Sequence, residues 1–233
     1  MQCASIDYFD VCNRMHYKDL HRWDLSAKDA VKLQIKLQKH IKLQKLNIEN
    51  IKTIAGVDVS VKNDTSQAAI VILSYPDLDI IETVKHNTKT VFPYVPGLLS
   101  FREGPVILKC IEKLKISPDL LVFDGQGLAH PRKMGLACHI GLFLEKPCIG
   151  SAKSHLFGQY QEPGPSKGDH SLILDNEDEA IGAVLRTRDN VKPIYVSPGY
   201  MVDIPSSVEF ILSCTPKYKL PEPIRAAHNA ASL

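Results

Sequence analysis

A glutamate lies within the apolar face of a helix that the sequence predicts for residues 97–114. Glu103 is four residues from both Leu99 and Ile107, so the three side chains share one face. The helix must therefore bring a carboxylate to the place where it packs on the core. A buried, unpaired carboxylate is costly, so a proton, an ion pair or a cation has to neutralise it. For a lone carboxylate of this kind, an ion-paired core residue is the structural alternative.

Two further carboxylates lie on predicted strands on either side of this helix. Asp58 belongs to a strand over residues 52–62, in which β-branched residues alternate and small residues share the face of the aspartate. Asp124 ends the apolar segment 119–124, at the carboxyl end of a buried strand, where open α/β sheets place their ligands. Each aspartate alone could be a turn or capping residue. With Glu103 they supply the hard oxygen ligands that Mg²⁺ or Mn²⁺ prefers, so the three are the predicted metal ligands.

The rest of the chain fits an α/β fold with a mixed sheet flanked by helices. A helix capped by Ser26 is expected to run to about Leu46. Three strands follow, at about 52–62, 68–75 and 78–91, and their short links imply an antiparallel meander. Helices and parallel strands then alternate. The expected later elements are the helix over 97–114, a strand over 119–124, a helix over about 131–145, strands over 147–151, 180–188 and 193–197, and helices over 206–214 and 222–231.

The order of a strand aspartate, a helix glutamate and a second strand aspartate resembles that of ribonuclease-H-like nucleases, whose carboxylates hold one or two divalent ions. Longer segments between about residue 54 and residue 228 resemble the endonuclease V family. They are Ala-Gly-Val-Asp-Val-Ser at 55–60, Pro-Tyr-Val-Pro-Gly-Leu-Leu-Ser-Phe-Arg-Glu at 93–103, Asp-Gly-Gln-Gly-Leu-Ala-His-Pro-Arg at 124–132, Gly-Leu-Ala-Cys-His-Ile-Gly at 135–141, Gly-Ser-Ala-Lys-Ser at 150–154, Ser-Pro-Gly at 197–199 and Leu-Pro-Glu-Pro-Ile-Arg-Ala-Ala-His at 220–228.

The resemblance implies a ribonuclease-H-like fold and a metal-dependent endonuclease of DNA repair. Such an enzyme recognises deaminated purine, chiefly hypoxanthine, and hydrolyses the second phosphodiester bond on its 3′ side, leaving a 3′-OH and a 5′-phosphate. Its cofactor would be Mg²⁺, with Mn²⁺ able to substitute, and its partner inosine-containing DNA, single- or double-stranded. We expect a monomer, with the nuclease domain over residues 24–233 and a leader of unknown role over residues 1–23.

The family positions also assign roles to two residues beyond the carboxylates. Lys153 follows a predicted strand and would counter charge on the scissile phosphate, whereas an exposed lysine is the structural alternative. His228 would help to bind metal or move protons, although a histidine on an apolar helix face can also be a core residue. With Asp58, Glu103 and Asp124 they make the predicted catalytic set. His139 and His155 are expected to be structural.

A second set of residues is predicted to bind the substrate. Tyr94 stands between two prolines that stiffen its loop, and its ring could fill the gap left by a base that has moved out of the stack. A tyrosine packed at the sheet edge is the alternative. Glycines after Asp124 would let the main chain approach the base, and His130 would orient a ligand, contact a phosphate or cap the next helix. The full predicted set is Pro93, Tyr94, Pro96, Gly97, Gly125, Gln126, Gly127, His130 and Arg132.

Composition allows this activity without identifying it. The 28 basic and 26 acidic residues give a net charge of only +2, so phosphate contacts must come from local patches. One candidate is the helical stripe of Lys28, Lys32, Lys36 and Lys39, for which a solvated helix face is the alternative. Six cysteines without metal-site spacing, no signal peptide and no long apolar segment predict a reduced, cytoplasmic protein without a membrane partner.

Alternatives in substrate and class stay open. Some relatives prefer inosine in RNA, although residues 93–103 resemble the bacterial, DNA-acting branch. A protein that binds inosine without cutting would be expected to lack a metal ligand, whereas all three carboxylates are present. The pair Gly125 and Gly127 after a strand also suggests dinucleotide binding, but position 130 is a histidine where the third glycine is needed.

Overall fold

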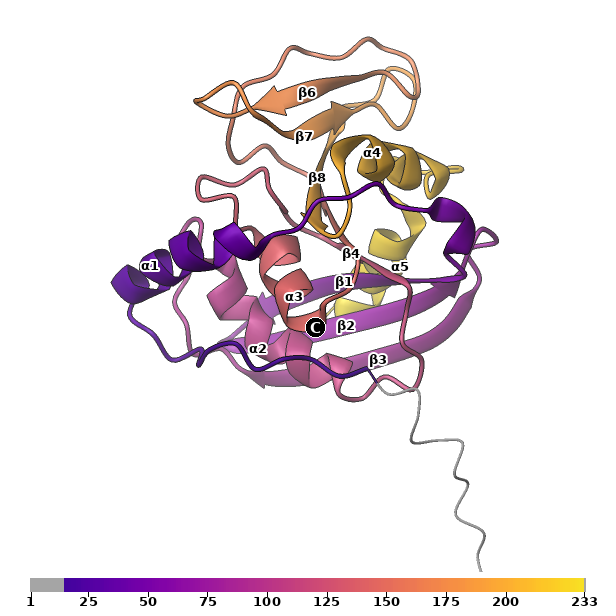
Figure 1. Cartoon of the computed structure of the whole chain (residues 1–233). Helices are drawn as coiled ribbons and strands as arrows, with labels where there is room; N and C mark the ends of the chain where they lie inside the picture. The colour runs from indigo at the N-terminus through magenta and orange to yellow at the C-terminus, as the bar shows by residue number, and fades with distance from the viewer. Residues whose placement is uncertain (1–14, 233) are drawn as a thin grey trace, which may run out of the picture.

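An eight-stranded mixed sheet forms the centre of the computed structural model, which describes residues 15–232 (Figure 1). The strands lie in the order β3-β2-β1-β4-β5-β8-β7-β6. Their bounds are β1 (Thr53–Lys62), β2 (Thr65–Ser74), β3 (Ile80–Lys89), β4 (Leu120–Phe123), β5 (Cys148–Ala152), β6 (His170–Leu174), β7 (Ala180–Leu185) and β8 (Ile194–Tyr200). The first three strands pair antiparallel, β4 and β5 continue parallel to β1, and β8, β7 and β6 return antiparallel. The predicted meander followed by parallel strands is confirmed.

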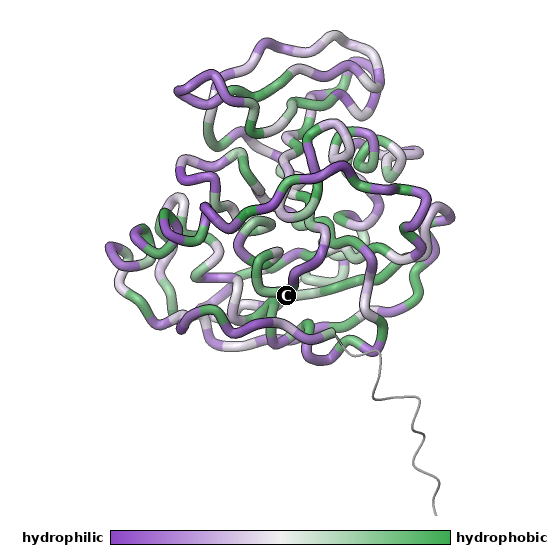
Figure 2. The backbone as a smooth tube through the Cα atoms, in the orientation of Figure 1, coloured by the Kyte–Doolittle hydropathy of each residue, from purple (hydrophilic) through white to green (hydrophobic). Residues whose placement is uncertain are grey.

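Helices cover both faces of this sheet. They are α1 (Ala27–Leu37), α2 (Leu99–Ile111), α3 (Leu136–Leu144), α4 (Ile204–Ser213) and α5 (Glu222–Ala231). Alternation along β1 divides the core: Ala55 and Val57 pack with α2 and α3, whereas Ile54 packs with α4 and α5. Hydrophobic segments gather in the central strands, and hydrophilic ones follow the outer loops (Figure 2). None of the helices in residues 15–232 has the length and apolar character needed to span a membrane.

Two predicted helices were wrong in extent, and one strand was not predicted. The first helix ends at Leu37, with a 3₁₀ turn to residue 40, instead of continuing to Leu46. The following segment is extended because its backbone bonds elsewhere: the Lys42 carbonyl accepts from Met201, and Leu46 donates to the Ser206 hydroxyl. The helix expected over 131–145 begins only at residue 136. Strand β6 was not predicted, since it is a short, largely exposed edge strand that follows a loop.

The N-terminal segment lies against α2 and α3. The Lys18 amide donates to the Phe143 carbonyl at 2.8 Å. Trp23 packs so closely on Gly104 that a Cβ there would lie 2.6 Å from the indole ring. Residues 15–23 of the proposed leader are therefore packed on the domain, while its cysteines, Cys3 and Cys12, lie outside the described residues. The division of the chain at residue 23 stays a prediction.

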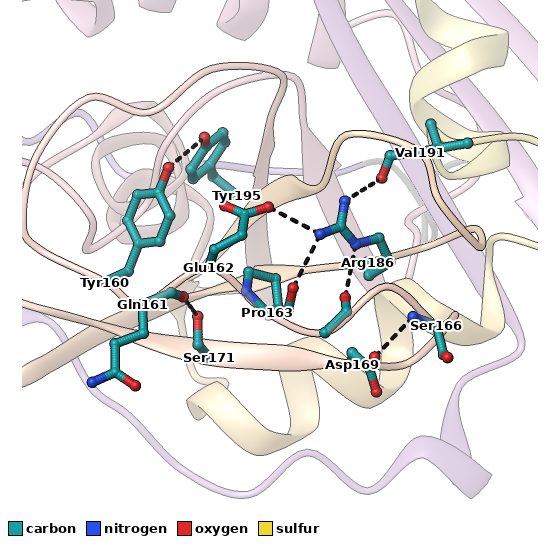
Figure 3. Close-up of polar contacts among 11 residues, drawn as sticks. Tyr160, Gln161, Glu162, Pro163, Ser166, Asp169, Ser171, Arg186, Val191 and Tyr195 are labelled. Carbon is teal, nitrogen blue, oxygen red and sulfur yellow. Dashed lines mark hydrogen bonds and ion pairs between the residues drawn. The ribbon is translucent and has the colours of Figure 1, made fainter.

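At the far end of the sheet, Arg186 ties β7 to the loop that follows β5 (Figure 3). Its guanidinium donates to the carbonyls of Pro163, Gly164 and Val191 at 3.0, 2.9 and 2.6 Å and to the Glu162 carboxylate at 2.9 Å. We call these five residues the Arg186 clamp. Because a buried guanidinium is expensive to leave unpaired, these bonds make the loop and β7 one unit.

Candidate active site

Three neighbouring parallel strands bring the middle of β1 and the carboxyl ends of β4 and β5 to one place. In the ladder between β1 and β4, Val57 lies opposite Phe123, so the next residues, Asp58 and Asp124, lie side by side. The Asp124 amide donates to the Val57 carbonyl at 2.9 Å, which holds the two chains together at this point. Lys153 follows the last residue of β5 directly. The sheet topology thus places two carboxylates and an ammonium at the position that α/β sheets use for ligands.

His228 joins the two aspartates from α5. Its Nδ1 lies 2.8 Å from Asp58 Oδ2, and one potential ligand atom from each of Asp58, Asp124 and His228 lies within 4.8 Å of the others. This approach requires the glycine at position 56, because a Cβ there would lie 1.9 Å from the Pro223 carbonyl oxygen of α5. The small residue on the face of Asp58 thus leaves room for the backbone of α5 to come close.

Glu103 lies at the buried side of this site, on α2, with 9% of its surface exposed. Burial, followed by the nearby charges of Asp58 and Asp124, raises the pKa of its carboxyl to about 8. The predicted position of the Glu103 carboxylate, where the helix packs on the core, is therefore confirmed. The carboxylate also interacts electrostatically with both aspartates. Glu103 is not in the group within 4.8 Å, where His228 stands instead, because Asp58 points to the face of β1 that α5 covers.

Lys153 is the counter-charge that contacts Asp124. Its Nζ donates to Asp124 Oδ2 at 2.5 Å. Burial raises the pKa of Asp124, and the hydrogen bond from Lys153 opposes that shift. The site contains two carboxylates with a third close by, and its basic groups are one imidazole and one lysine. The carboxylates are therefore not fully neutralised. Oxygen ligands with one nitrogen suit Mg²⁺ or Mn²⁺, so the donor set fits such an ion.

A pocket of about 560 Å³, including its open mouth, lies between the loop before α2 and the start of α3. Of the residues predicted to bind substrate, Tyr94, Pro96, Gly97, Gln126 and His130 line it. Those not predicted are Gln34, Val95, Leu99, Ser100, Met134, Gly135, Leu136 and Leu156. Gln34 could have been predicted from the helical spacing. It is a polar residue four positions after Ala30 on the buried face of α1, much as Glu103 lies on the buried face of α2.

The Gly97 carbonyl accepts hydrogen bonds from three side chains behind the pocket wall. Gln34 Nε2, His130 Nε2 and Arg132 Nη2 lie 3.1, 2.9 and 2.7 Å from it. The Arg132 amide donates to His130 Nδ1, so His130 carries its single proton on Nε2. Burial lowers the pKa of His130 to about 4, which keeps the ring neutral. His130 and Arg132 thus support the wall; only His130 also lines the pocket.

The remaining predicted substrate-binding residues lie around the pocket without lining it. Gly127 packs against β8, since a Cβ there would lie 2.0 Å from the Pro198 carbonyl oxygen, and its amide donates to Ser197 Oγ at 2.8 Å. A Cβ at Gly125 would meet only Leu136 at ordinary contact distance. Pro93 lies beside the separate pocket under Trp23. The substrate roles of all these residues stay predictions.

The chain is similar to known proteins in both sequence and structure. The family model described as Endonuclease V matches residues 35–229. An endonuclease V of Petrotoga mobilis is 49% identical over 214 residues, which cover 92% of this chain and 96% of the relative. The crystal structure of an endonuclease V from Bacillus subtilis has a TM-score of 0.88 at 33% identity, covering 93% of this chain and 95% of that one.

A third comparison concerns a structure with nucleic acid. An endonuclease V of Ciona intestinalis, solved in complex with a 24mer DNA containing an inosine followed by a ribo-adenosine, has a TM-score of 0.76 at 24% identity. It covers 88% of this chain and 95% of that one. At this identity the likeness concerns the fold.

Proposed function

Because the chain belongs to the endonuclease V family of nucleases, we propose that it cleaves DNA at deaminated purine, chiefly hypoxanthine. Cleavage would hydrolyse the second phosphodiester bond on the 3′ side of the lesion and leave a 3′-OH and a 5′-phosphate. The observation that carries this proposal is an incompletely neutralised group of carboxylates, Asp58 on β1, Asp124 after β4 and Glu103 on α2, in a protein with a separate pocket.

Asp58, Asp124 and His228 would hold Mg²⁺, with Mn²⁺ able to substitute, and Glu103 would add its charge from the buried side. When bound, the ion supplies a polarised water and stabilises charge on phosphate oxygens. Lys153 Nζ, beside Asp124, would neutralise charge that develops on the scissile phosphate. The ring of His228 is held by Asp58 and is otherwise exposed, so it can exchange a proton with water at the site.

The pocket suits a base with a carbonyl group on its edge. Leu99 and Ser100 open α2, and Leu136 opens α3; neither helix has a side-chain cap, although the Ala137 amide donates to the Gln126 carbonyl. The first N–H groups of a helix lack partners within the helix and carry partial positive charge. Donors of this kind favour the O6 carbonyl of hypoxanthine over the amino group that adenine carries at the same position.

Tyr94 would fill the gap that the extruded base leaves. Its side chain lines the pocket and is 72% exposed, unlike a tyrosine packed on a sheet edge. The loop is anchored beside it by Phe92, whose carbonyl accepts from Arg102 at 3.0 Å. Tyr94→Ala should weaken binding to inosine-containing duplex by roughly 1–3 kcal/mol, with a smaller loss on a single strand. Tyr94→Phe keeps the ring and should bind as the parent does; equal losses on both substrates would remove the wedge.

Matched inosine-containing DNA and RNA strands, incubated with Mg²⁺, test the function and its substrate. We expect a single nick in DNA, one nucleotide beyond the inosine on its 3′ side. Faster cleavage of the RNA strand would move the substrate to inosine-containing RNA. Binding of both strands without any cleavage would make the protein an inosine-binding protein instead.

We further propose that the protein works as a monomer in the cytoplasm. The four cysteines of the described residues, Cys110, Cys138, Cys148 and Cys214, are free and buried, which suits a reducing compartment. Sedimentation of the protein with and without an inosine-containing strand would test the monomer.

A further inference from the structure

A chain of three hydrogen-bonding side chains runs from the N-terminal segment to the pocket. His21 Nε2 lies 2.7 Å from His139 Nε2, and His139 Nδ1 lies 2.7 Å from Ser100 Oγ. Ser100 is among the residues around the pocket, with 1% of its surface exposed, and His139 is fully buried on α3. The rings of Trp23 and Phe101 pack on His139 with centroids 5.1 and 5.2 Å away, so its imidazole is held in place.

The partners decide which atom carries each proton. The Arg22 carbonyl lies 2.9 Å from His21 Nδ1 and can only accept, so this nitrogen carries the proton of His21. Burial lowers the pKa of both His21 and His139, so each ring is neutral and holds one proton. His21 Nε2 then accepts, and His139 Nε2 donates to it. His139 Nδ1 is left to accept, and the Ser100 hydroxyl must donate to it.

We propose that Ser100 is a specificity-determining residue, held by His139 and His21 so that its hydroxyl can act only as an acceptor toward the base. The proposal rests on the function proposed above and deepens it. Hypoxanthine has a proton on N1, whereas adenine presents a lone pair there. Because the proton of Ser100 is committed to His139, its oxygen can accept from N1–H of hypoxanthine but has nothing to donate to N1 of adenine.

The pocket contains a second candidate acceptor that the test must separate from Ser100. Gln126 Nε2 donates to the Ser154 carbonyl at 3.0 Å, whereas Gln126 Oε1 is buried and has no hydrogen-bond partner within residues 15–232. Gln126 is fixed by one bond to the main chain and is independent of the histidine pair. Each residue can therefore be changed without altering the other's partners.

A double-mutant cycle between protein and base tests the contact. Binding of the parent and of Ser100→Ala is measured on duplexes that carry hypoxanthine or 1-deazahypoxanthine, in which a C–H replaces N1–H. We expect Ser100→Ala to lose about 3- to 10-fold in affinity for hypoxanthine and nothing for the 1-deaza base. Equal losses on the two bases would overturn the proposal. Coupling of Gln126→Leu, but not of Ser100→Ala, to N1–H would assign the contact to Gln126 and overturn it as well.

His21→Phe tests the histidine pair without emptying the aromatic cluster. The phenyl ring keeps the packing but has no acceptor, so the proton of His139 can move to Nδ1 and the Ser100 hydroxyl can turn toward the pocket. Discrimination between inosine and adenosine should fall by about the same 3- to 10-fold, and Ser100→Ala should then add no further loss. Tyr17→Phe, a change in the same segment at a ring that packs on Phe143, should leave discrimination at the parent value.

Nitrogen NMR of the imidazoles shows which ring nitrogen of His139 carries the proton. A purely structural role of His21 would not predict a change in this protonation between the parent and His21→Phe. In the parent, His139 should have an unprotonated Nδ1 and a protonated Nε2, and in His21→Phe the reverse. A protonated Nδ1 in the parent would overturn the proposal. Absence of any preference of the parent for inosine over adenosine would instead remove the proposed function. A parent that retains this preference with no coupling at Ser100 would remove only the present inference.

Discussion

The carboxylate site and the Arg186 clamp bury charged side chains to nearly the same extent. The side chains of Asp58 and Asp124 are 11% and 13% exposed, and that of Arg186 is 11% exposed. Arg186 reaches three carbonyls and one carboxylate, so its charge is satisfied within the chain (Figure 3). The two aspartates have one lysine and one histidine as side-chain partners, with the carboxyl group of Glu103 close by.

The difference separates a structural charge from one that awaits a ligand. Burial alone is similar at both places, so burial does not tell the two apart. The supply of partners does: the clamp is complete, whereas the carboxylate site keeps an excess of negative charge. Burial, with the charges of Asp58 and Asp124 added to it, raises the pKa of Glu103 to about 8. Changes at the two places should therefore affect different properties of the protein.

The largest effect is expected from removing an aspartate. Asp58→Ala or Asp124→Ala should lower the cleavage rate by a factor on the order of 10³ or more, since each would remove metal stabilisation worth several kcal/mol. Binding of the inosine-containing strand should stay measurable, and thermal stability should not fall, because a like charge is removed. Single-turnover kinetics with Mg²⁺ check the rate. Full cleavage by either variant would mean that the site is structural like the clamp.

The pH dependence of stability should show the excess charge directly. The pKa of Glu103 rises from 4.5 to about 8 on folding, so between these values the unfolded chain is ionised while the folded protein keeps its proton. The free energy of unfolding should therefore fall with rising pH across this window, by about 1.4 kcal/mol per pH unit from this group, and level off above it. Glu103→Gln should lose this slope and be more stable near pH 8.

Denaturant unfolding in EDTA at several pH values measures that slope. Mg²⁺ should flatten the slope of the parent, because a bound cation favours the ionised carboxylate. If the free energy of unfolding has the same pH slope in the parent and in Glu103→Gln, the charge of the Glu103 carboxylate is balanced within the chain as fully as that of Arg186.

Breaking the Arg186 clamp should lower the free energy of unfolding and leave the cleavage rate unchanged. Arg186→Met keeps much of the side-chain volume but leaves the carbonyls of Pro163, Gly164 and Val191 without their donor. We expect a loss of roughly 2–4 kcal/mol in the free energy of unfolding, because buried unsatisfied carbonyls are costly. The cleavage rate of the folded variant should equal that of the parent. A large loss of rate at unchanged stability would place Arg186 in the reaction.

The smallest of these effects concerns Lys153. Lys153→Ala should lower the cleavage rate by a factor on the order of 10² if its ammonium neutralises charge on the phosphate. The variant should also lose some stability, because the buried Asp124 carboxylate loses its counter-charge. Lys153→Arg keeps a charge in the same place and should recover part of the rate. An unchanged single-turnover rate would show that Lys153 only pairs with Asp124, as Glu162 pairs with Arg186.

Local periodicity was enough to place the three predicted carboxylate ligands in their strands and helix. Alternation placed Asp58 in a strand, helical spacing placed Glu103 on a buried face, and an apolar segment ending in Asp124 marked a strand end; the structure confirms all three positions. These patterns depend on neighbours within a few residues, which is why they can be interpreted without a fold. The helix expected to reach Leu46 was wrong for the complementary reason, since distant partners hold its backbone extended.

Contacts between distant segments were decided only by the tertiary structure. His228 reaches Asp58 across 170 positions because α5 covers the face of β1 to which Asp58 points. His21 reaches His139 across 118 positions because the N-terminal segment crosses α2 and α3. Which helix covers which face of the sheet depends on strand order and on how the core closes, and no local pattern carries that information. The sequence by itself therefore determined in which strands and helices the predicted site residues lie, whereas the packing of the sheet and its helices decided which of them meet.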